Sequence, residues 1–211
     1  MSTLLYITAH PLQEQQSNSL STGAVFLEAY QNAQPQDEII ELNLFEAGVP
    51  NIDADLFNAW SKLRKGADFA VLTEEEQQKA GKHKELSDQF AAADKYVFVN
   101  PMWNHFLPPI LKAYLDALCV AGKTFRYTPQ GPVGLLAGKK VLHIQSAGGA
   151  YNRETVEVKD FGHAYLAHIM HFFGITDAQG LFVEGMDANP AEAPAIKEQA
   201  RQQAVRIAET F

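Results

Sequence analysis

The chain has 211 residues, of which 46% are hydrophobic, and this predicts one soluble α/β domain over residues 1–211. Its formal net charge of −8 argues against nucleic acid or an anionic membrane as a partner, because either would require a basic stripe that no segment provides. No apolar run approaches the ~18 residues of a membrane span, and no basic leader precedes residue 4, so we expect neither export nor membrane insertion.

Cys119 is the single cysteine of the chain, so no intrachain disulfide can form. It lies among apolar positions of a predicted helix, where a cysteine usually acts as a small buried hydrophobe. A reducing cytoplasm therefore fits the sequence.

Short apolar or β-branched runs alternate with helical patterns along the chain. The runs predict strands at residues 4–8, 39–44, 96–99, 141–145 and 181–183, with 39–44 near a sheet edge because charge intrudes there. Helical spacing predicts helices from about residue 19 to 30, at 56–63, 73–93, 109–118 and 161–173, and within 190–211. Gly174 stands where a left-handed cap would end its helix. This order predicts a doubly wound, five-stranded parallel sheet with helices on both faces.

The stretch at residues 96–119 organises the rest of the chain. Its strand lacks polar alternation, which is typical of a central strand covered on both faces, and Pro108 and Pro109 suit the first turn of the following helix. The loop at 100–107 therefore leaves the carboxyl end of a parallel strand, where open α/β sheets place their ligands. The plainer alternative is that Met102, Trp103 and Phe106 only cap the core.

Two other loops carry polar or glycine-rich sequences at the ends of their strands. Ser17, Asn18 and Ser19 precede a helix, so hydroxyls, free N–H groups and the positive end of the helix dipole converge there and suit a phosphate. Helix capping by one serine is the alternative. Gly148 and Gly149 follow another strand and would let the backbone approach a flat ligand. Together, the three loops predict a mononucleotide in one crevice.

Several other motifs match only in part. Gly122-Lys123-Thr124 ends a helix, whereas a P-loop follows a strand, and no G-x-G-x-x-G supports a Rossmann dinucleotide site. Ile144 replaces the first glycine of a G-x-S-x-G nucleophile elbow at Ser146, which leaves esterase chemistry as an alternative. The spacing of His163, His168 and His171 lacks H-E-x-x-H, so a helix surface or subunit contact is preferred over a metal.

Four segments together resemble the FMN-dependent NADH-azoreductases, also described as FMN-dependent NADH:quinone oxidoreductases: PMWNHFLPPILKAYLD, TFRYTPQGPVGLLAGKK, SNS and SAGG. The resemblance spans nearly the whole chain and implies a flavodoxin-like fold, one FMN per subunit and a homodimer with active sites at its interface. It implies that Ser17, Asn18 and Ser19 hold the phosphate, that Met102 to His105 line the isoalloxazine and that Ser146 to Gly149 close its other edge. The complete set of implied FMN contacts is His10, Ser17, Asn18, Ser19, Pro101, Met102, Trp103, Asn104, His105, Ser146, Ala147, Gly148 and Gly149. Phe125 and Tyr127 are implied as aromatic walls on the substrate side.

The resemblance also implies ping-pong transfer of two electrons from NADH to quinones and azo compounds, with no catalytic side chain because the flavin carries the chemistry. Two departures stand out: His105 where some members carry Phe, and Ala147 where some carry Arg. The alternative is a flavodoxin-like electron carrier that needs a partner reductase. No residue distinguishes NADH from NADPH. Residues 50–93 exceed the length of one crossover, so they predict a lid, a subunit contact or an extra covering helix.

Overall fold

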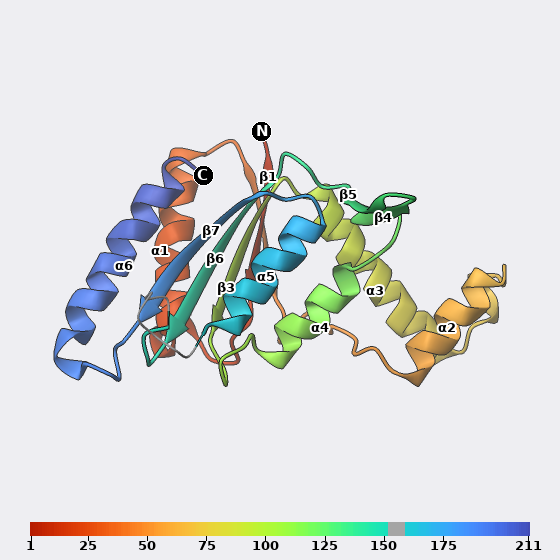
Figure 1. The fold of residues 1–211 in the computed structure, drawn as a ribbon, viewed down its shortest axis with the longest axis horizontal. Coiled ribbons are helices and arrows are strands. Elements are labelled where there is room, and N and C mark those ends of the chain that lie inside the picture. Colours follow the sequence, from red (N-terminus) through yellow and green to blue (C-terminus); the bar gives the residue numbers. More distant parts are fainter. Residues whose placement is uncertain (152–158) are drawn as a thin grey trace.

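A parallel sheet of five strands in the order β2-β1-β3-β6-β7 forms the centre of the computed structural model, which describes residues 1–151 and 159–211 (Figure 1). The pairings β1 with β2, β1 with β3, β3 with β6 and β6 with β7 are all parallel. The predicted doubly wound sheet is therefore confirmed, with β3 at its centre and β2 at an edge. The strands are β1 (Thr3–Thr8), β2 (Glu38–Asn43), β3 (Lys95–Pro101), β6 (Lys140–Ala147) and β7 (Asp177–Glu184).

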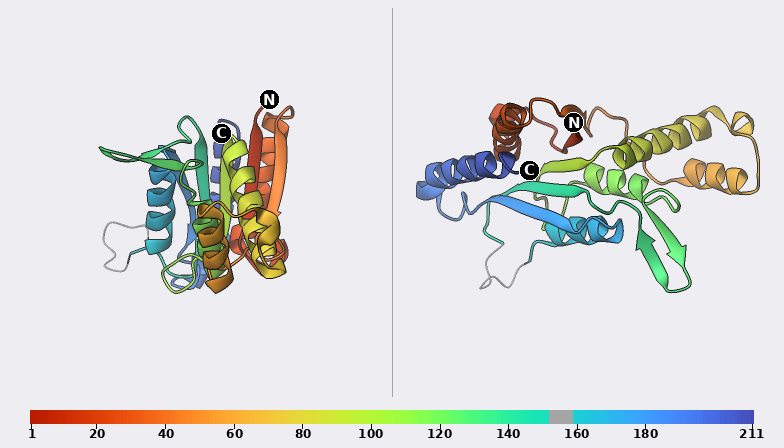
Figure 2. Two further views of the ribbon diagram at one scale, coloured as in Figure 1. Left: turned by 90° about the vertical axis from the view of Figure 1, so that its right-hand side faces the viewer. Right: turned by 90° about the horizontal axis from the view of Figure 1, so that it is seen from above.

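Helices cover both faces of this sheet (Figure 2). On one face lie α1 (Asn18–Ala33) and α6 (Ala193–Ala208), and on the other lie α3 (Glu74–Ala92), α4 (Pro109–Leu118) and α5 (Phe161–Phe172). Each of these helices was predicted from helical spacing, and Gly174 has the expected left-handed backbone with φ 92°. None of the helices in the described part combines the length and apolarity needed to cross a bilayer.

The side chains of β3 show why this strand lacks polar alternation. Tyr96 and Phe98 belong to the core beneath α3, α4 and α5, whereas Val97 and Val99 belong to the core beneath α1 and α6. All four side chains are fully buried. A strand with two covered faces needs apolar residues at successive positions, so the run itself indicated a central strand.

The helix α2 (Ala54–Arg64) lies away from the sheet, against the first half of α3 (Figure 1). Leu56, Ala59, Leu72 and Ala80 form a small separate core there, and Lys62 pairs with the buried carboxylate of Glu76 at 2.7 Å. The second half of α3 covers the sheet through Leu86 and Phe90. Residues 50–93 thus provide one covering helix and an extension beyond the sheet.

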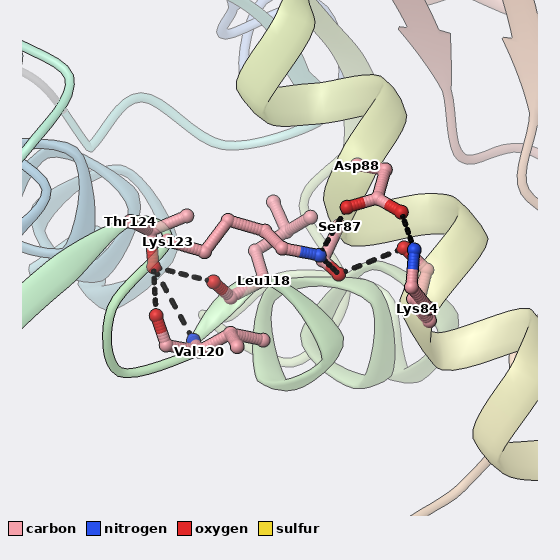
Figure 3. A network of polar contacts seen from close by, with 7 residues as sticks. All are labelled: Lys84, Ser87, Asp88, Leu118, Val120, Lys123 and Thr124. Atoms are coloured by element: carbon pink, nitrogen blue, oxygen red, sulfur yellow. Dashed lines mark hydrogen bonds and ion pairs between the residues drawn. The ribbon is translucent and has the colours of Figure 1, made fainter. Parts of the chain in front are cut away.

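The turn after α4 is fastened to α3 by the network in Figure 3. Lys123 Nζ donates to Ser87 Oγ at 2.8 Å and pairs with Asp88, while Thr124 Oγ1 donates to the carbonyl of Leu118 at 2.7 Å. Gly122 has the left-handed backbone of a tight turn, with φ 85°. Gly122-Lys123-Thr124 is therefore a turn that follows a helix. A P-loop would follow a strand, so the structure agrees with the prediction that this segment is not one.

An antiparallel hairpin, β4 (Phe125–Thr128) and β5 (Gly131–Gly134), follows this turn and was not predicted. It contacts the end of α5, where a Cβ at Gly134 would lie 2.1 Å from the backbone nitrogen of Gly174. The prediction of a buried Cys119 is wrong, because this residue is exposed just after the last residue of α4. The helical stripe ends one residue earlier than the sequence indicated.

Candidate functional site

Four loops meet at the carboxyl ends of β1, β3, β6 and β7 and enclose a hollow of ≈ 170 Å³, called here the four-loop hollow. Strands β1, β3 and β6 are neighbours in the sheet, so their loops leave the same edge. The predicted convergence of these three loops is confirmed. The lining residues are Asn18, Pro101, Met102, Trp103, Ser146, Ala147, Gly148, Met186 and Asp187.

The first loop places two buried hydroxyls at the start of α1. Ser17 is the N-cap, and its Oγ accepts the N–H of Leu20 at 3.2 Å, so the capping alternative is confirmed for this serine. Ser17 Oγ and Ser19 Oγ lie 3.1 Å apart. Within the described residues, the N–H groups of Asn18 and Ser19 at this helix start have no acceptor. The loop thus has both a cap and donors left over for an anion.

His10 lies in the same loop but does not line the four-loop hollow. Its Nδ1 accepts the N–H of Leu12 at 3.0 Å, and burial lowers the pKa of the imidazole. It lines a neighbouring depression formed by residues 10–15, Asn43, Phe45 and Glu46. Its role as an FMN contact stays a prediction.

The loop after β3 closes in a tight turn between Trp103 and Phe106. The Trp103 N–H donates to the Phe106 carbonyl at 2.9 Å and the Phe106 N–H returns the bond at 3.0 Å. Asn104 and His105 between them have φ of 50° and 64°, the left-handed pair of a type I′ turn. Their N–H groups have no acceptor within the described part of the chain. Asn104 therefore offers a free backbone donor, whereas the N–H of Trp103 is already used.

The loop after β6 is held by the loop that follows β7. Asp187 N–H donates to the Gly148 carbonyl at 3.0 Å, and Gly185 N–H donates to the Gly149 carbonyl at 3.0 Å. A Cβ at Gly148 would lie 2.0 Å from Asp187 Oδ2, and one at Gly149 would lie 2.9 Å from the Tyr151 hydroxyl. A side chain at either position would therefore displace Asp187 or Tyr151, and the proposed approach of these glycines to a ligand stays a prediction.

Met186 and Asp187 are site residues that the sequence analysis missed. They follow β7, which pairs with β6, so the same sheet-edge rule that located the other loops would have located this one. The exposed Asp187 carboxylate adds a negative charge to the rim of the hollow.

Phe125 and Tyr127 do not line the four-loop hollow of their own chain. Phe125 is buried, with its ring centroid 4.5 Å from that of Phe172, whereas Tyr127 is 75% exposed on the hairpin. In Figure 1 the carboxyl ends of the sheet strands lie at the bottom, whereas β4 and β5 lie at the upper right. The expected role of Phe125 and Tyr127 as walls on the substrate side stays a prediction.

The three histidines of α5 have different surroundings. His168 and His171 are exposed, as expected for a helix surface. His163 is instead half-buried and stacks on His143, with ring centroids 5.2 Å apart. Within residues 1–151 and 159–211, no three His, Cys, Asp or Glu side chains are grouped to hold a metal ion.

When only the five strands of the parallel sheet are numbered in chain order, their order in the sheet is 2-1-3-4-5. This order, with a crevice at its switch point, defines a flavodoxin-like protein. The family model described as flavodoxin-like fold matches residues 2–207. The chain is 53% identical to FMN-dependent NADH:quinone oxidoreductase 3 of Halalkalibacterium halodurans and 50% identical to FMN-dependent NADH:quinone oxidoreductase 2 of Bacillus subtilis, each over 211 residues and the whole of both chains.

Solved structures agree with these relatives. An azoreductase from Bacillus anthracis superposes with a TM-score of 0.92 at 35% identity, covering 100% of both chains. An FMN-dependent NADH-azoreductase from the same organism, crystallised in complex with FMN, gives 0.88 at 34% identity over 99% of this chain and 100% of that one. The chain therefore belongs to the family of FMN-dependent NADH:quinone oxidoreductases and azoreductases.

Proposed function

We propose that this chain is an FMN-dependent oxidoreductase that transfers two electrons from NADH to quinones and, by reductive cleavage, to aromatic azo compounds. The observation that carries the proposal is the convergence of the loops after β1, β3 and β6 in one hollow, within a chain that matches relatives of that name over its full length. We further propose that residues 1–211 act as one flavin-binding domain in the cytoplasm.

The residues of the first loop fit the phosphate of FMN. The hydroxyls of Ser17 and Ser19 are buried at the start of a helix of 16 residues, beside two N–H groups that have no acceptor among residues 1–151 and 159–211. A phosphate there would accept those hydrogen bonds and gain from the positive end of the helix dipole. Among the described residues that line the hollow, Asp187 is the only acidic one, and it follows β7 and not β1.

The loops after β3 and β6 fit a flat ring. Pro101, Met102 and the 38% exposed Trp103 give an apolar wall, and the type I′ turn supplies free N–H groups at Asn104 and His105. Fixed backbone donors favour negative charge on a ring held against them. Ser146, Ala147 and Gly148 line the same hollow after β6, and the missing Cβ at Gly148 leaves room for the Asp187 carboxylate beside it. Bound FMN would supply the hydride and electron-transfer chemistry at this place.

We propose a ping-pong order in which NADH leaves before the acceptor binds. The four-loop hollow is an open depression of ≈ 170 Å³, below the ~300 Å³ at which enclosed ligand pockets begin. A flavin ring held in this open depression would keep one face exposed, and NADH and then the acceptor would occupy that face in turn.

The same small volume supports a homodimer with shared active sites. Phe57, Tyr127 and Phe161 are 61%, 75% and 58% exposed, and a contact between two copies would remove apolar surface of this kind from water. A two-fold axis would apply the same contact to both sites. Activity per flavin should fall with dissociation on dilution, followed by analytical ultracentrifugation at matched concentrations; a fully active monomer would rule out the shared site.

The purified protein's visible spectrum and an azo-dye assay test the proposal. Two flavin absorption bands that stay with the protein on gel filtration, with NADH-dependent bleaching of the dye, are the expected results. A protein that binds no flavin when FMN is added would overturn the proposed function.

A further inference from the structure

A chain of buried hydrogen bonds runs from α5 through β6 and β3 to the wall of the four-loop hollow. His163 Nδ1 lies 3.0 Å from His143 Nδ1, and His143 Nε2 lies 2.9 Å from Asn100 Oδ1. Asn100 Nδ2 then donates to the carbonyl of Pro101 at 2.9 Å. His143 is 2% exposed and Asn100 is 0% exposed, so the bond between these two side chains is shielded from water.

The donor and the acceptor of each of these three hydrogen bonds follow from the groups available. If the Asn100 amide were turned over, its oxygen would face the Pro101 carbonyl oxygen at hydrogen-bond distance, with no proton between them. The amide oxygen therefore faces His143, whose Nε2–H must donate to it. His143 Nδ1 is then without a proton and accepts from Nδ1–H of His163. Burial lowers the pKa of both imidazoles, which agrees with a neutral His143.

The chain of bonds ends at a residue of the site. Pro101 is the last residue of β3 and lines the four-loop hollow, and the loop bearing Met102, Trp103 and Asn104 starts from it. Proline has no N–H, so its carbonyl is the one backbone group that a neighbour can hold. The Asn100 amide holds this carbonyl, and His143 holds the amide.

Apolar packing alone does not account for these residues. His143 lies in the middle of β6, where its strand neighbours Leu142 and Ile144 are fully buried. A buried imidazole costs free energy unless both nitrogens are bonded, so an aliphatic residue would serve a purely structural role at less cost. The two bonds that His143 makes point to a role that needs a donor at Nε2.

We propose that His143 is a positioning residue for the flavin site, acting through Asn100 on the Pro101 carbonyl and so on the wall formed by Pro101 to Trp103. This inference rests on the proposed function, since it assumes that FMN binds in the four-loop hollow. His143 itself touches no part of the hollow.

Two substitutions at this position separate its two bonds. In His143→Gln the side-chain amide ends near the place of Nε2, so the donor to Asn100 is kept and the bond to His163 is lost. In His143→Asn the amide ends near the place of Nδ1, so the bond to His163 is kept and the donor to Asn100 is lost. Each variant loses one hydrogen bond of His143: the Gln variant loses the part-buried bond to His163, and the Asn variant loses the buried bond to Asn100.

Flavin-fluorescence titration of the apoproteins measures the effect. We expect His143→Asn to weaken FMN binding roughly tenfold, the effect of one lost buried hydrogen bond, and His143→Gln to stay within about twofold of the wild type. Tyr96→Phe is the control for lost stability, because it removes buried bonds to the Phe90 and Ala93 carbonyls at the other end of β3. Its FMN affinity should be unchanged even where its melting temperature falls.

Equal weakening in the Gln and Asn variants, or an affinity that follows melting temperature across all three variants, would overturn the inference while leaving FMN binding by the wild type intact. A wild type that binds no FMN would overturn the proposed function and the inference with it. Long-range ¹H–¹⁵N spectra of the wild type give a second test that needs no variant. They should show His143 protonated at Nε2 and His163 at Nδ1, and a His143 protonated only at Nδ1 would contradict the inference.

Discussion

Replacing both Ser17 and Ser19 with alanine should weaken FMN binding by about 30-fold. Hydrogen bonds to a charged group contribute roughly 1.5–3 kcal/mol each, so two hydroxyls give at least about 3 kcal/mol. The two oxygens lie 3.1 Å apart in the free protein, and breaking that contact offsets part of the gain. A neutral contact contributes about 1 kcal/mol, so about 2 kcal/mol remains, which corresponds to about 30-fold in the dissociation constant.

The fold should lose less than the ligand does. Ser17 caps α1 through a 3.2 Å bond from Leu20 N–H, and loss of such a cap costs about 1 kcal/mol, or roughly 2–4 °C in melting temperature for a chain of this size. Thr73→Ala is the matched control, because Thr73 caps α3 through a bond of the same 3.2 Å length away from the hollow. Flavin-fluorescence titration and thermal melts of the three proteins decide the matter. An unchanged FMN affinity in the double variant, or an equal loss in Thr73→Ala, would refute the phosphate assignment.

Three further predictions concern titration, backbone strain and thiol reactivity. Burial holds the pKa of His143 well below its usual range, so the unfolded chain binds a proton near pH 6 that the folded chain does not. The contribution of neutral His143 to the free energy of unfolding is therefore complete above about pH 6.5 and is lost as the pH falls, at up to about 1.4 kcal/mol per pH unit. In urea melts from pH 7 to 5, the free energy of unfolding should decline less steeply for His143→Gln than for the wild type. An identical decline would contradict this prediction. Gly174→Ala should cost at least about 1–2 kcal/mol, because this residue has φ 92° and its Cβ would lie 3.2 Å from the Gly134 carbonyl carbon; a melting temperature equal to wild type would contradict the strain. Although Cys119 is exposed as a residue, burial of its thiol, aided by Asp116, raises the pKa of the thiol to about 11. Iodoacetamide should therefore react slowly with Cys119 at pH 7.5 and faster toward pH 10. Rapid labelling at pH 7 would refute the raised pKa.

The order of the sheet could be predicted because its strands carry unambiguous signals. Strand β3 is buried on both faces and β2 bears Glu38 and Glu41 at an edge, and each sequence shows this directly. The hairpin β4–β5 could not be predicted in the same way. Its strands have four residues each and contain Gly131, Pro132 and Gly134, so neither alternation nor β propensity identifies them.

Three of the loops around the hollow were predicted from their place after strands, because the carboxyl-end rule needs only the strand order. The finer geometry depends on contacts that sequence spacing does not contain. Asn104-His105 forms a type I′ turn, although the second position of such turns usually carries glycine. The bond between His143 and Asn100 joins residues 43 positions apart on neighbouring strands, and only the register of β3 against β6 brings them together.

Steady-state oxidation of NADH by the purified, FMN-reconstituted protein with a soluble quinone, and no second protein, tests the central claim most directly. Our account predicts sustained turnover with two electrons delivered per NADH, and parallel lines in double-reciprocal plots when both substrates are varied. A protein that binds FMN but oxidises NADH only after a partner reductase is added would contradict the account, since that is the behaviour of an electron carrier.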